Sequence, residues 1–290
     1  MSDFDLCAFS DSVAAVAEAA AAVTASVLSQ RGRTTTAFHW GDGLYVAAEE
    51  AVDPDAEQRL TLPSGETVAA ELLGRDPSTG VALLKPAAGA DMPVLAGAGT
   101  VRAGNLAIAA GRAGPAPLAV LGTVSEVGDA WRSLRGGVID RRINLAILAG
   151  ARFEGGPVLD ANGALVGMLL FGPRRRALVI PYETIGRTVA TLREKGRVMR
   201  GYLGAGLQPI RDSTVAGAIV MSLDEDGPAR AAGIVLGDIV TGWNGEAVRG
   251  PRELIRKLGP DSAGAAVTLT VLRGGAAREI ALTVGEKPLG

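Results

Sequence analysis

The sequence predicts a mainly β protein of two domains, in which a closed barrel or sandwich is followed by a smaller α+β unit. Its 290 residues are about twice the usual length of one domain. Hydrophobic residues make up 48% of the chain, aromatic residues only 4%, and the 40 glycines supply many turn positions. This composition favours short strands packed by small aliphatic side chains over long helices.

The first domain is expected to have a helix at each end of a set of short strands. Residues 12–27 begin with high helix propensity and then carry β-branched residues that can start a strand. Between residues 34 and 180 the apolar runs are short and separated by Gly, Pro or Asp, as in a closed barrel or sandwich. From 182 to 195 apolar residues recur on one face and Gly196 follows, so a second helix is expected to close this domain.

The second domain is expected to mix strands with two short helices. These are predicted at PARAAGI (228–234) and at PRELIRKLG (251–259), where Pro251 is a start signal favoured in the first helical turn. The strands VTLTVLR (267–273) and REIALTV (278–284) flank Gly274 and Gly275, a pair that suits a hairpin with a tight primed turn.

Charge and cysteine content narrow the class of protein. The formal net charge of −2 gives no basic field for nucleic acid, and a single cysteine, Cys7, cannot form an intramolecular disulfide. No apolar run is long enough to span a membrane. Acidic residues near the N-terminus and Glu18 within the alanine-rich run leave no visible signal peptide. We therefore expect a cytoplasmic protein, or a periplasmic one whose export signal has been removed, without metal or cofactor.

Seven stretches of sequence carry family motifs. In the first domain they are LPSGETVAAELLGRDPSTGVALLK (62–85), GGPVLDANGALVGM (155–168) and LVIPYETI (178–185). In the second they are GYLGAGL (201–207), GAIVMSL (217–223), GPARAAGIVLGDIVTGWNGEAV (227–248) and GAAVTLTVLRGGAAREIALTV (264–284). The chain thereby resembles the HtrA/DegP family of trypsin-like serine proteases. The resemblance implies an N-terminal helical segment at 1–30, a trypsin-like double β-barrel at 31–197, and an α+β PDZ domain at 198–290.

The positions that match the family's catalytic residues carry other residues. By the resemblance, Glu50 stands at the place of the base histidine, Gly80 at that of the aspartate, and Glu154 at that of the nucleophilic serine. Serine proteolysis needs a nucleophile, a base in contact with it and an acid that orients the base. The sequence therefore predicts a pseudoprotease with no catalytic residues, which is not an enzyme. The only histidine, His39, lies upstream and is expected to be structural.

Charged residues near these positions leave alternatives open. At the base and nucleophile positions, the carboxylates of Glu50 and Glu154 would be neighbours in space and would raise each other's pKa. Such a pair would suit general acid/base chemistry or a cation site. The arginines at 174–176 occupy a loop that shapes the rim of the substrate pocket in the family. They are either a solvated loop or neutralise the two glutamates. Arg141 and Arg142 lie in the loop before Leu145 and Ala146, which by the resemblance replace a Thr-Asp pair at the substrate pocket of the family.

A peptide-binding site is implied in the PDZ domain. Its predicted residues are Tyr202, Leu203, Gly204, Ala205, Gly206, Leu207, Leu254 and Leu258. The first four would form a loop whose amides face a terminal carboxylate, and a peptide would add as a strand beside the segment that follows. The leucines would line a pocket for its last side chain, or else are core residues. Pro209 suits an edge strand, and Asp238 and Asn244 are expected in structural turns.

The sequence thus predicts a pseudoprotease that binds peptides or protein C-termini as an adaptor, chaperone or regulator in protein quality control. The alternatives are a hydrolase or cation-binding protein using Glu50 and Glu154, and a non-catalytic subunit of an active protease paralogue. The resemblance also implies a homotrimer formed through an aromatic N-terminal segment, for which Phe4 and Phe9 are the candidates.

Overall fold

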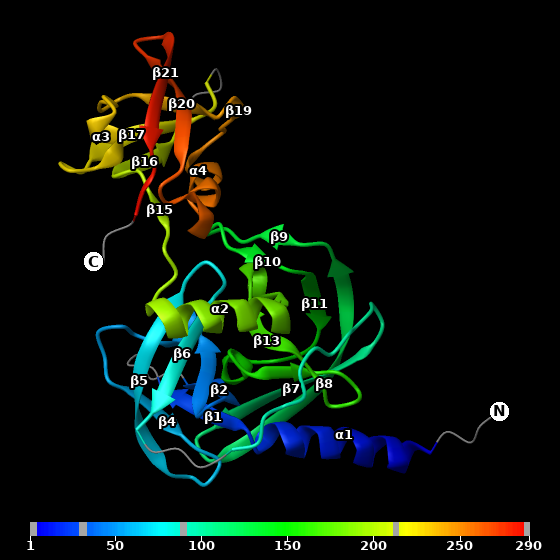
Figure 1. The fold of residues 1–290 in the computed structure, drawn as a ribbon. Helices are drawn as coiled ribbons and strands as arrows, with labels where there is room; N and C mark the ends of the chain where they lie inside the picture. Colours follow the sequence, from blue (N-terminus) through cyan, green and yellow to red (C-terminus); the bar gives the residue numbers. More distant parts are fainter. Residues whose placement is uncertain (1–4, 29–33, 88–91, 211–214, 287–290) are drawn as a thin grey trace. The chain divides into compact units, whose positions relative to one another are not determined.

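The computed structural model describes residues 5–28, 34–87, 92–210 and 215–286 (Figure 1). The chain divides into two compact units, Met1–Trp131 with Val138–Val198, and Arg132–Gly137 with Met199–Gly290. The first holds two closed six-stranded barrels and the second an open sheet with short helices. The mainly β prediction, with a double barrel before an α+β unit, is therefore confirmed.

The first barrel has the strand order β1-β2-β3-β6-β5-β4, and all its pairs are antiparallel. Its strands are β1 (Thr24–Leu28), β2 (Thr34–Gly41), β3 (Leu44–Ala48), β4 (Gln58–Thr61), β5 (Thr67–Asp76) and β6 (Val81–Pro86), and the 3-10 helix η1 (Glu49–Ala51) follows β3. Buried side chains from alternate positions, such as Val27, Tyr45, Leu60 and Leu84, fill its core. Since β1 pairs with β2 and β4, the barrel already begins before residue 31.

The second barrel has the order β11-β14-β13-β12-β7-β8. Its strands are β7 (Leu106–Ala113), β8 (Ala116–Gly128), β11 (Arg142–Ala146), β12 (Pro157–Leu159), β13 (Leu165–Phe171) and β14 (Ala177–Pro181). The short strands β9 (Trp131–Arg132) and β10 (Val138–Ile139) pair with each other, and the 3-10 helices are η2 (Ala151–Phe153) and η3 (Pro173–Arg175). The loop before β12 carries Glu154, and the loop between β13 and β14 carries the arginines at 174–176.

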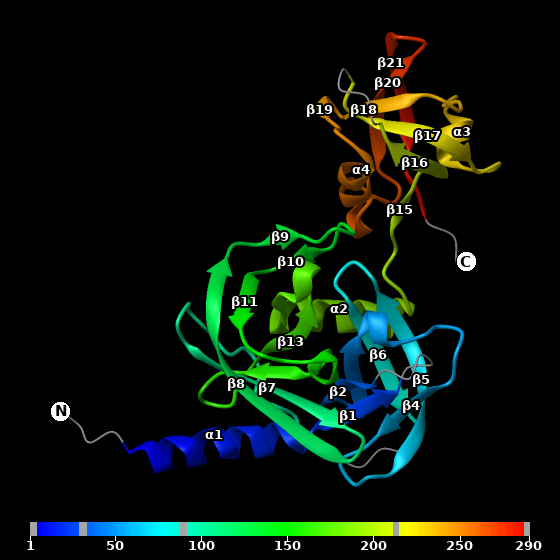
Figure 2. The same cartoon turned by 180° about the vertical axis from the view of Figure 1, so that it is seen from behind.

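Two helices accompany the barrels. The helix α1 (Leu6–Ala21) lies beside β7 and β8 (Figure 1 and Figure 2), and it begins earlier than expected because the Asp5 side chain accepts hydrogen bonds from the amides of Cys7 and Ala8. Phe9 lies in α1, whereas Phe4 is outside the described residues. The helix α2 (Tyr182–Lys195) has the predicted bounds and ends at Gly196, whose φ of 68° gives the left-handed cap.

A buried arginine joins α1 to the second barrel. The side chain of Arg112, in β7, donates to the carbonyl of Ala21 at 2.5 Å, to that of Pro115 at 2.6 Å and to Thr24 Oγ1 at 3.3 Å. Burial lowers the pKa of Arg112, although neighbouring Tyr45 opposes this. A cation at the carbonyl end of a helix is favourable, so Arg112 stabilises the docked position of α1.

The second unit contains a sheet of order β16-β17-β18-β20-β21, with β19 beside β18, and a separate pair β15-β22. Its strands are β15 (Gly201–Tyr202), β16 (Ala205–Pro209), β17 (Ala218–Leu223), β18 (Ile239–Trp243), β19 (Glu246–Ala247), β20 (Ala266–Arg273), β21 (Ala276–Thr283) and β22 (Gly285–Glu286). Its helices are α3 (Pro228–Ala231), α4 (Pro251–Lys257) and η4 (Pro260–Ser262). Gly274 and Gly275 both have positive φ between β20 and β21, as the predicted primed turn requires.

Candidate functional site

The loop that carries Glu154 packs against the segment that carries Glu50. Gly155 has a φ of 80°, and a Cβ on it would lie 2.3 Å from the carbonyl oxygen of Thr36 and 2.8 Å from the amide nitrogen of Ala48. Ala48 ends β3, and Glu50 follows in η1. Only glycine allows this approach of backbone to backbone, so the two segments lie side by side.

Gly80 completes the group of predicted catalytic positions. Its carbonyl accepts a hydrogen bond from the amide of Glu49 at 2.9 Å, and a Cβ on it would lie 2.7 Å from Leu170 Cδ1 in β13. With a φ of 77° it occupies a turn that favours glycine. The fold therefore brings together the segments of all three positions between the two barrels.

Glu49 is one of the buried carboxylates of this region, and sequence reasoning did not single it out. Its side chain is 5% exposed and accepts a hydrogen bond from Arg75 Nη1 at 2.9 Å. Glu50, which the resemblance places at the histidine position, is exposed. Two adjacent glutamates look alike in a sequence, and only the pairing of β5 with β6 places Arg75 beside the first of them.

The backbone before Glu154 forms its own hydrogen bonds. In η2 the amide of Phe153 donates to the carbonyl of Gly150 at 3.0 Å, and the amide of Glu154 donates to that of Ala151 at 3.1 Å. A loop that stabilises an oxyanion must instead direct amides toward the substrate oxygen. In the conformation seen here, the Glu154 amide faces a carbonyl of its own loop.

Thr36 holds this loop from the first barrel. Its amide donates to the carbonyl of Glu154 at 2.9 Å, and its hydroxyl donates to the carbonyl of Arg152 at 2.6 Å. The same hydroxyl accepts from the amide of Arg112 at 2.9 Å. One buried threonine therefore links the loop at Glu154 to β7, whose Arg112 side chain reaches α1.

His39 lies away from these positions. It is 5% exposed, its Nδ1 is 3.0 Å from the carbonyl oxygen of Pro93, and its ring centroid is 5.5 Å from that of Tyr45. Its Nε2 is buried and has no hydrogen-bond partner in the described part of the chain. The structure gives it a packing role inside the first barrel.

The arginines near the cleft fall into two groups. Arg141 forms an ion pair with Glu183 at 3.1 Å, and the guanidinium of Arg142 lies 5.3 Å from the centroid of the Trp131 ring. The residues of the 174–176 run are exposed and form no ion pair with any residue that the structure describes. They therefore do not neutralise Glu50 or Glu154 here.

In the second unit the predicted peptide loop is fixed through its carbonyl groups. The amide of Ala229 donates to the carbonyl of Leu203 at 2.8 Å, and that of Asp224 donates to the carbonyl of Gly204 at 2.9 Å. The Tyr202 hydroxyl donates to the Asp224 carboxylate. The loop leads into β16, which pairs with β17 and, among the described strands, lies at the edge of the sheet.

The four leucines predicted to line the peptide pocket differ in burial. Leu203 is 4% exposed and Leu254 is fully buried, and both belong to the core of this unit. Leu207 and Leu258 are half-buried against that core. The first pair matches the core alternative, whereas the second pair keeps side-chain surface that a ligand can contact.

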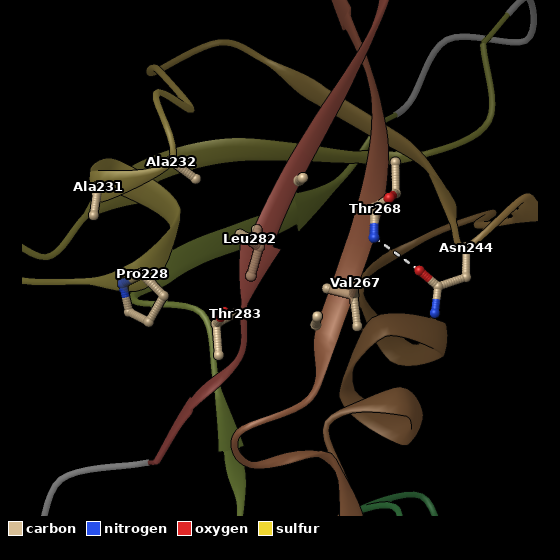
Figure 3. A pocket seen from close by; sticks show the side chains of 10 residues that line it. Pro228, Ala231, Ala232, Asn244, Val267, Thr268, Leu282 and Thr283 are labelled. Atoms are coloured by element: carbon tan, nitrogen blue, oxygen red, sulfur yellow. Dashed lines mark hydrogen bonds between the residues drawn. The ribbon is translucent and has the colours of Figure 1, made fainter.

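A different groove of about 560 Å³ lies elsewhere in this unit (Figure 3). Its lining residues are Pro228, Ala231, Ala232, Asn244, Ala266, Val267, Thr268, Ala281, Leu282 and Thr283. Asn244 Oδ1 accepts from the amide of Thr268 at 2.7 Å at one side of it. None of the eight predicted peptide-binding residues lines this groove. Most of its lining residues are small or apolar and form no recognisable motif, so the sequence did not predict this groove.

A buried ion pair stabilises the turn before β18. Asp238 is 1% exposed and accepts from Arg273 Nε at 2.8 Å, from Arg273 Nη2 at 2.7 Å and from the amide of Val235 at 3.0 Å. These interactions with Arg273 hold the pKa of the Asp238 carboxyl below its usual value. Asp238 therefore has the structural role expected for it.

The described residues contain no cluster of three or more His, Cys, Asp or Glu side chains that suits a metal ion. Cys7 is an exposed free thiol. Among the described helices, none is both long and apolar enough to cross a membrane. No observation thus favours the cation-binding alternative.

The sequence was compared with protein families, curated proteins and solved structures. It matches the trypsin-like peptidase domain family over residues 35–168 and the PDZ domain family over residues 201–284. A probable periplasmic serine endoprotease, DegP-like, of Brucella suis biovar 1 (strain 1330) is 34% identical over 85% of this chain and 51% of the relative. The protein of the same name from Rhizobium meliloti (strain 1021) is 28% identical over 90% of this chain and 55% of the relative. The chain spans about half the length of these curated relatives.

Solved structures share the fold. The HtrA-type protease AlgW with a decapeptide superposes with a TM-score of 0.69 at 20% identity, over 96% of this chain and 99% of that chain. The serine endoprotease from Yersinia pestis superposes with a TM-score of 0.69 at 22% identity, over 95% and 98%. Two barrels followed by one PDZ domain define the class: a trypsin-like peptidase fold joined to a PDZ domain. With the matches in sequence, the chain belongs to the HtrA/DegP-type trypsin-like serine proteases that carry a PDZ domain.

These findings correct the expectation that the chain is not an enzyme. Relatives that match most of its length are named serine endoproteases. The expectation depended on three side chains, at Glu50, Gly80 and Glu154, and the identity of side chains at matched positions does not measure hydrolysis.

Two further expectations have different outcomes. The cytoplasmic location is not supported, because the relatives are named periplasmic. The homotrimer stays a prediction.

Proposed function

We propose that this chain binds polypeptides through their C-termini at its PDZ domain, and that it acts on them as an HtrA-type adaptor, chaperone or regulator. The observation that carries the proposal is the edge strand β16, which directly follows a loop whose Leu203 and Gly204 carbonyls are bound by the protein itself. An exposed strand edge can accept an extended peptide as a further strand.

The orientation of the loop follows from the geometry of the peptide bond. In a trans peptide the C=O and the N–H point in opposite directions, and the described residues contain no cis bond. The carbonyls of Leu203 and Gly204 point toward the amides of Ala229 and Asp224. The next amides along the chain, those of Gly204 and Ala205, therefore point away from these partners. Two consecutive amides with a left-handed glycine, whose φ is 69°, suit a carboxylate.

Side chains beside the loop supply an apolar surface for the last residue of the peptide. The half-buried Leu207 and Leu258 would contact it, while Leu203 and Leu254 support them from the core. Gly206 keeps the strand narrow, because a Cβ there would lie 2.2 Å from Ser222 Oγ. The AlgW structures with a decapeptide and with a tripeptide show that proteins of this fold hold peptides. Together these features support a site for an apolar C-terminal residue.

Fluorescence anisotropy with a labelled decapeptide ending in valine tests the proposal. The free-acid peptide should bind about tenfold or more tightly than its C-terminal amide, because the amide removes the charge. Leu258→Glu should weaken binding of the free acid by at least as much. Ile255→Glu, at a residue of α4 that is 40% exposed, is the matched control and should bind normally. Equal binding of acid and amide, or equal loss in both variants, would contradict the proposal.

The same peptides allow hydrolysis to be measured directly. Mass spectrometry of each mixture after incubation reports whether a bound peptide is also cut. Following the names of the relatives, we propose that the chain works in the periplasm. Fractionation of cells that express the full protein tests this location.

A further inference from the structure

Three adjacent arginines, Arg174, Arg175 and Arg176, form the turn between β13 and β14; we call this the arginine turn. The last residue pair of the hairpin is Phe171 with Ala177. The amide of Gly155 donates to the carbonyl of Leu169 at 2.8 Å, so the chain before Gly155 runs beside the end of β13. The arginine turn therefore begins at the strand end next to Glu154.

The charges of this turn are not neutralised. Its three side chains are exposed and form no ion pair with the residues that the structure describes. Glu154, in the loop beside the end of β13, is half-buried and already takes part in other interactions. Elsewhere the chain does pair its arginines with carboxylates: Arg141 with Glu183, Arg187 with Asp140, Arg193 with Asp42 and Arg273 with Asp238. Like charges placed together without counter-charges repel, so the turn is an unsatisfied cationic site.

The backbone of the turn is held in an unusual conformation. Arg174 and Arg175 have φ values of 59° and 56°, a left-handed region that side chains other than Gly, Asn and Asp rarely adopt. The amide of Gly172 donates to the carbonyl of Arg176 at 2.9 Å and closes the loop. The Arg175 guanidinium lies 5.5 Å from the centroid of the Phe171 ring. Strain of this kind is concentrated at functional sites.

Apolar surface lies beside these charges. The segment after β11 leaves the barrel next to the turn, because Leu145 pairs with Ala177. Its Leu148 is 95% exposed, and Phe171 is half-buried. Cations next to exposed apolar groups match a polypeptide that carries both acidic and apolar side chains.

We propose that the arginine turn binds acidic side chains of a polypeptide that lies beside the loop at Glu154. The inference rests on the proposed function, in that the chain recognises polypeptides, and adds a second contact that selects their sequence. A protein ligand is favoured over nucleic acid because the chain has a net charge of −2 and the cationic site is confined to one turn with apolar neighbours.

The test uses labelled dodecapeptide amides, because an amidated terminus takes the PDZ loop out of the measurement. One peptide alternates Glu with Leu and its partner alternates Gln with Leu. The variant R174Q/R175Q/R176Q removes the charges of the turn. The control R59Q/R102Q/R193Q removes the same total charge from exposed positions elsewhere in the first unit, where Arg59 and Arg193 form surface ion pairs with Glu57 and Asp42. Circular dichroism and the affinity for a free-acid peptide at the PDZ domain report whether each variant is folded.

The acidic peptide should bind the unaltered chain more tightly than the Gln peptide. The turn variant should weaken it about tenfold, and the control by less than about twofold. Raising the salt to about 1 M should remove most of the difference, since screening then acts over about 3 Å.

Three results would overturn the inference: equal binding of the two peptides, equal loss in both variants, or tighter binding of a single-stranded oligonucleotide than of the acidic peptide. If the free-acid peptide still binds in any of these cases, the proposed function stands without the inference. If neither peptide type binds, both fail.

Discussion

The peptide loop of the PDZ domain and the loop at Glu154 both contain a glycine packed closely against another backbone segment, but their amide groups are oriented differently. Each contains a left-handed glycine pressed against another backbone: a Cβ on Gly204 would lie 2.6 Å from Gly227 Cα, and one on Gly155 would lie 2.3 Å from the Thr36 carbonyl oxygen. In the PDZ loop, neighbouring amides bind the carbonyls. In the loop at Glu154 the carbonyls are bound as well, but the Glu154 amide also donates within the loop.

The difference shows what makes a backbone loop able to bind an anion. Close packing of a glycine fixes the path of the chain in both loops. Ligand binding depends on which side of each peptide plane the protein itself satisfies. The PDZ loop directs two amides outward, whereas the loop at Glu154 must rearrange before the Glu154 amide can face a ligand. The predictions below test this contrast.

The largest expected effect separates the core residue that supports the predicted peptide site from the residue that would contact the peptide. Leu254→Ala removes a fully buried side chain and should lower the free energy of unfolding by about 3 kcal/mol. Leu258→Ala, at a half-buried position, should cost under about 1 kcal/mol yet weaken binding of the free-acid peptide several-fold. Urea unfolding and anisotropy measure the two quantities. Equal stability losses would mean that the two leucines do not divide in this way.

Features of the fold that depend on neighbouring residues in the sequence could be predicted. The bounds of α2, its cap at Gly196 and the turn at Gly274 and Gly275 follow from periodicity and glycine positions. The motifs gave the two domains in order. The N-cap at Asp5, which lengthens α1, was also a local signal, but the acidic residues there were interpreted only as evidence against a signal peptide.

Contacts between distant parts of the chain could not be predicted. Thr36 and Arg152 are 116 positions apart, and Arg112 and Ala21 are 91 apart. Threonine and arginine are common surface residues, so their burial here is set by how the barrels pack. For the same reason the sequence identified Glu50 and gave no sign of Glu49, whose partner Arg75 lies in β5, on the far side of β6 from β3.

The next prediction concerns the scaffold behind the PDZ loop, where β17 pairs with both β16 and β18. Asp238→Asn should cost about 2 kcal/mol at neutral pH, because it breaks a buried, charge-assisted pair with Arg273. The pKa of Asp238 is lowered in the folded state, so its contribution is present above the unfolded pKa of about 4 and is lost as the pH falls through the folded pKa.

Urea unfolding of both proteins between neutral and strongly acidic pH checks the sign. The difference in stability should shrink on acidification. Glu246→Gln, which removes an exposed pair with Lys257, is the control and should have a much smaller effect. A stability difference for Asp238→Asn that stays constant at all pH values would contradict the linkage.

A glycine pair distinguishes backbone strain from loss of the binding loop. Gly204→Ala adds a left-handed alanine and a Cβ 2.6 Å from Gly227 Cα, so it should cost about 2 kcal/mol and weaken the free-acid peptide at least about tenfold. Gly233→Ala has the same type of φ, 85°, but no atom within 4 Å of the new Cβ. It should cost about 1 kcal/mol and leave peptide affinity unchanged. Loss of affinity in both variants would show that stability, not loop geometry, controls binding.

The smallest expected effect tests the cleft side of the comparison with two neighbouring threonines. Thr36→Val keeps the shape of the side chain but leaves the Arg152 carbonyl and the Arg112 amide without this partner, which should cost about 1 to 2 kcal/mol. Thr35 is also buried, yet its hydroxyl has no hydrogen-bond partner in the described part of the chain. Thr35→Val should therefore be neutral or slightly stabilising.

Hydrogen exchange at Phe153 and Glu154 completes this test, because both amides are bonded within η2. If Thr36 holds the loop in its present conformation, exchange there should accelerate in Thr36→Val and stay unchanged in Thr35→Val. Unchanged exchange in both variants would show that η2 keeps the Glu154 amide turned inward by itself. The contrast with the PDZ loop would then lie in the local sequence of the loop and not in the barrel that supports it.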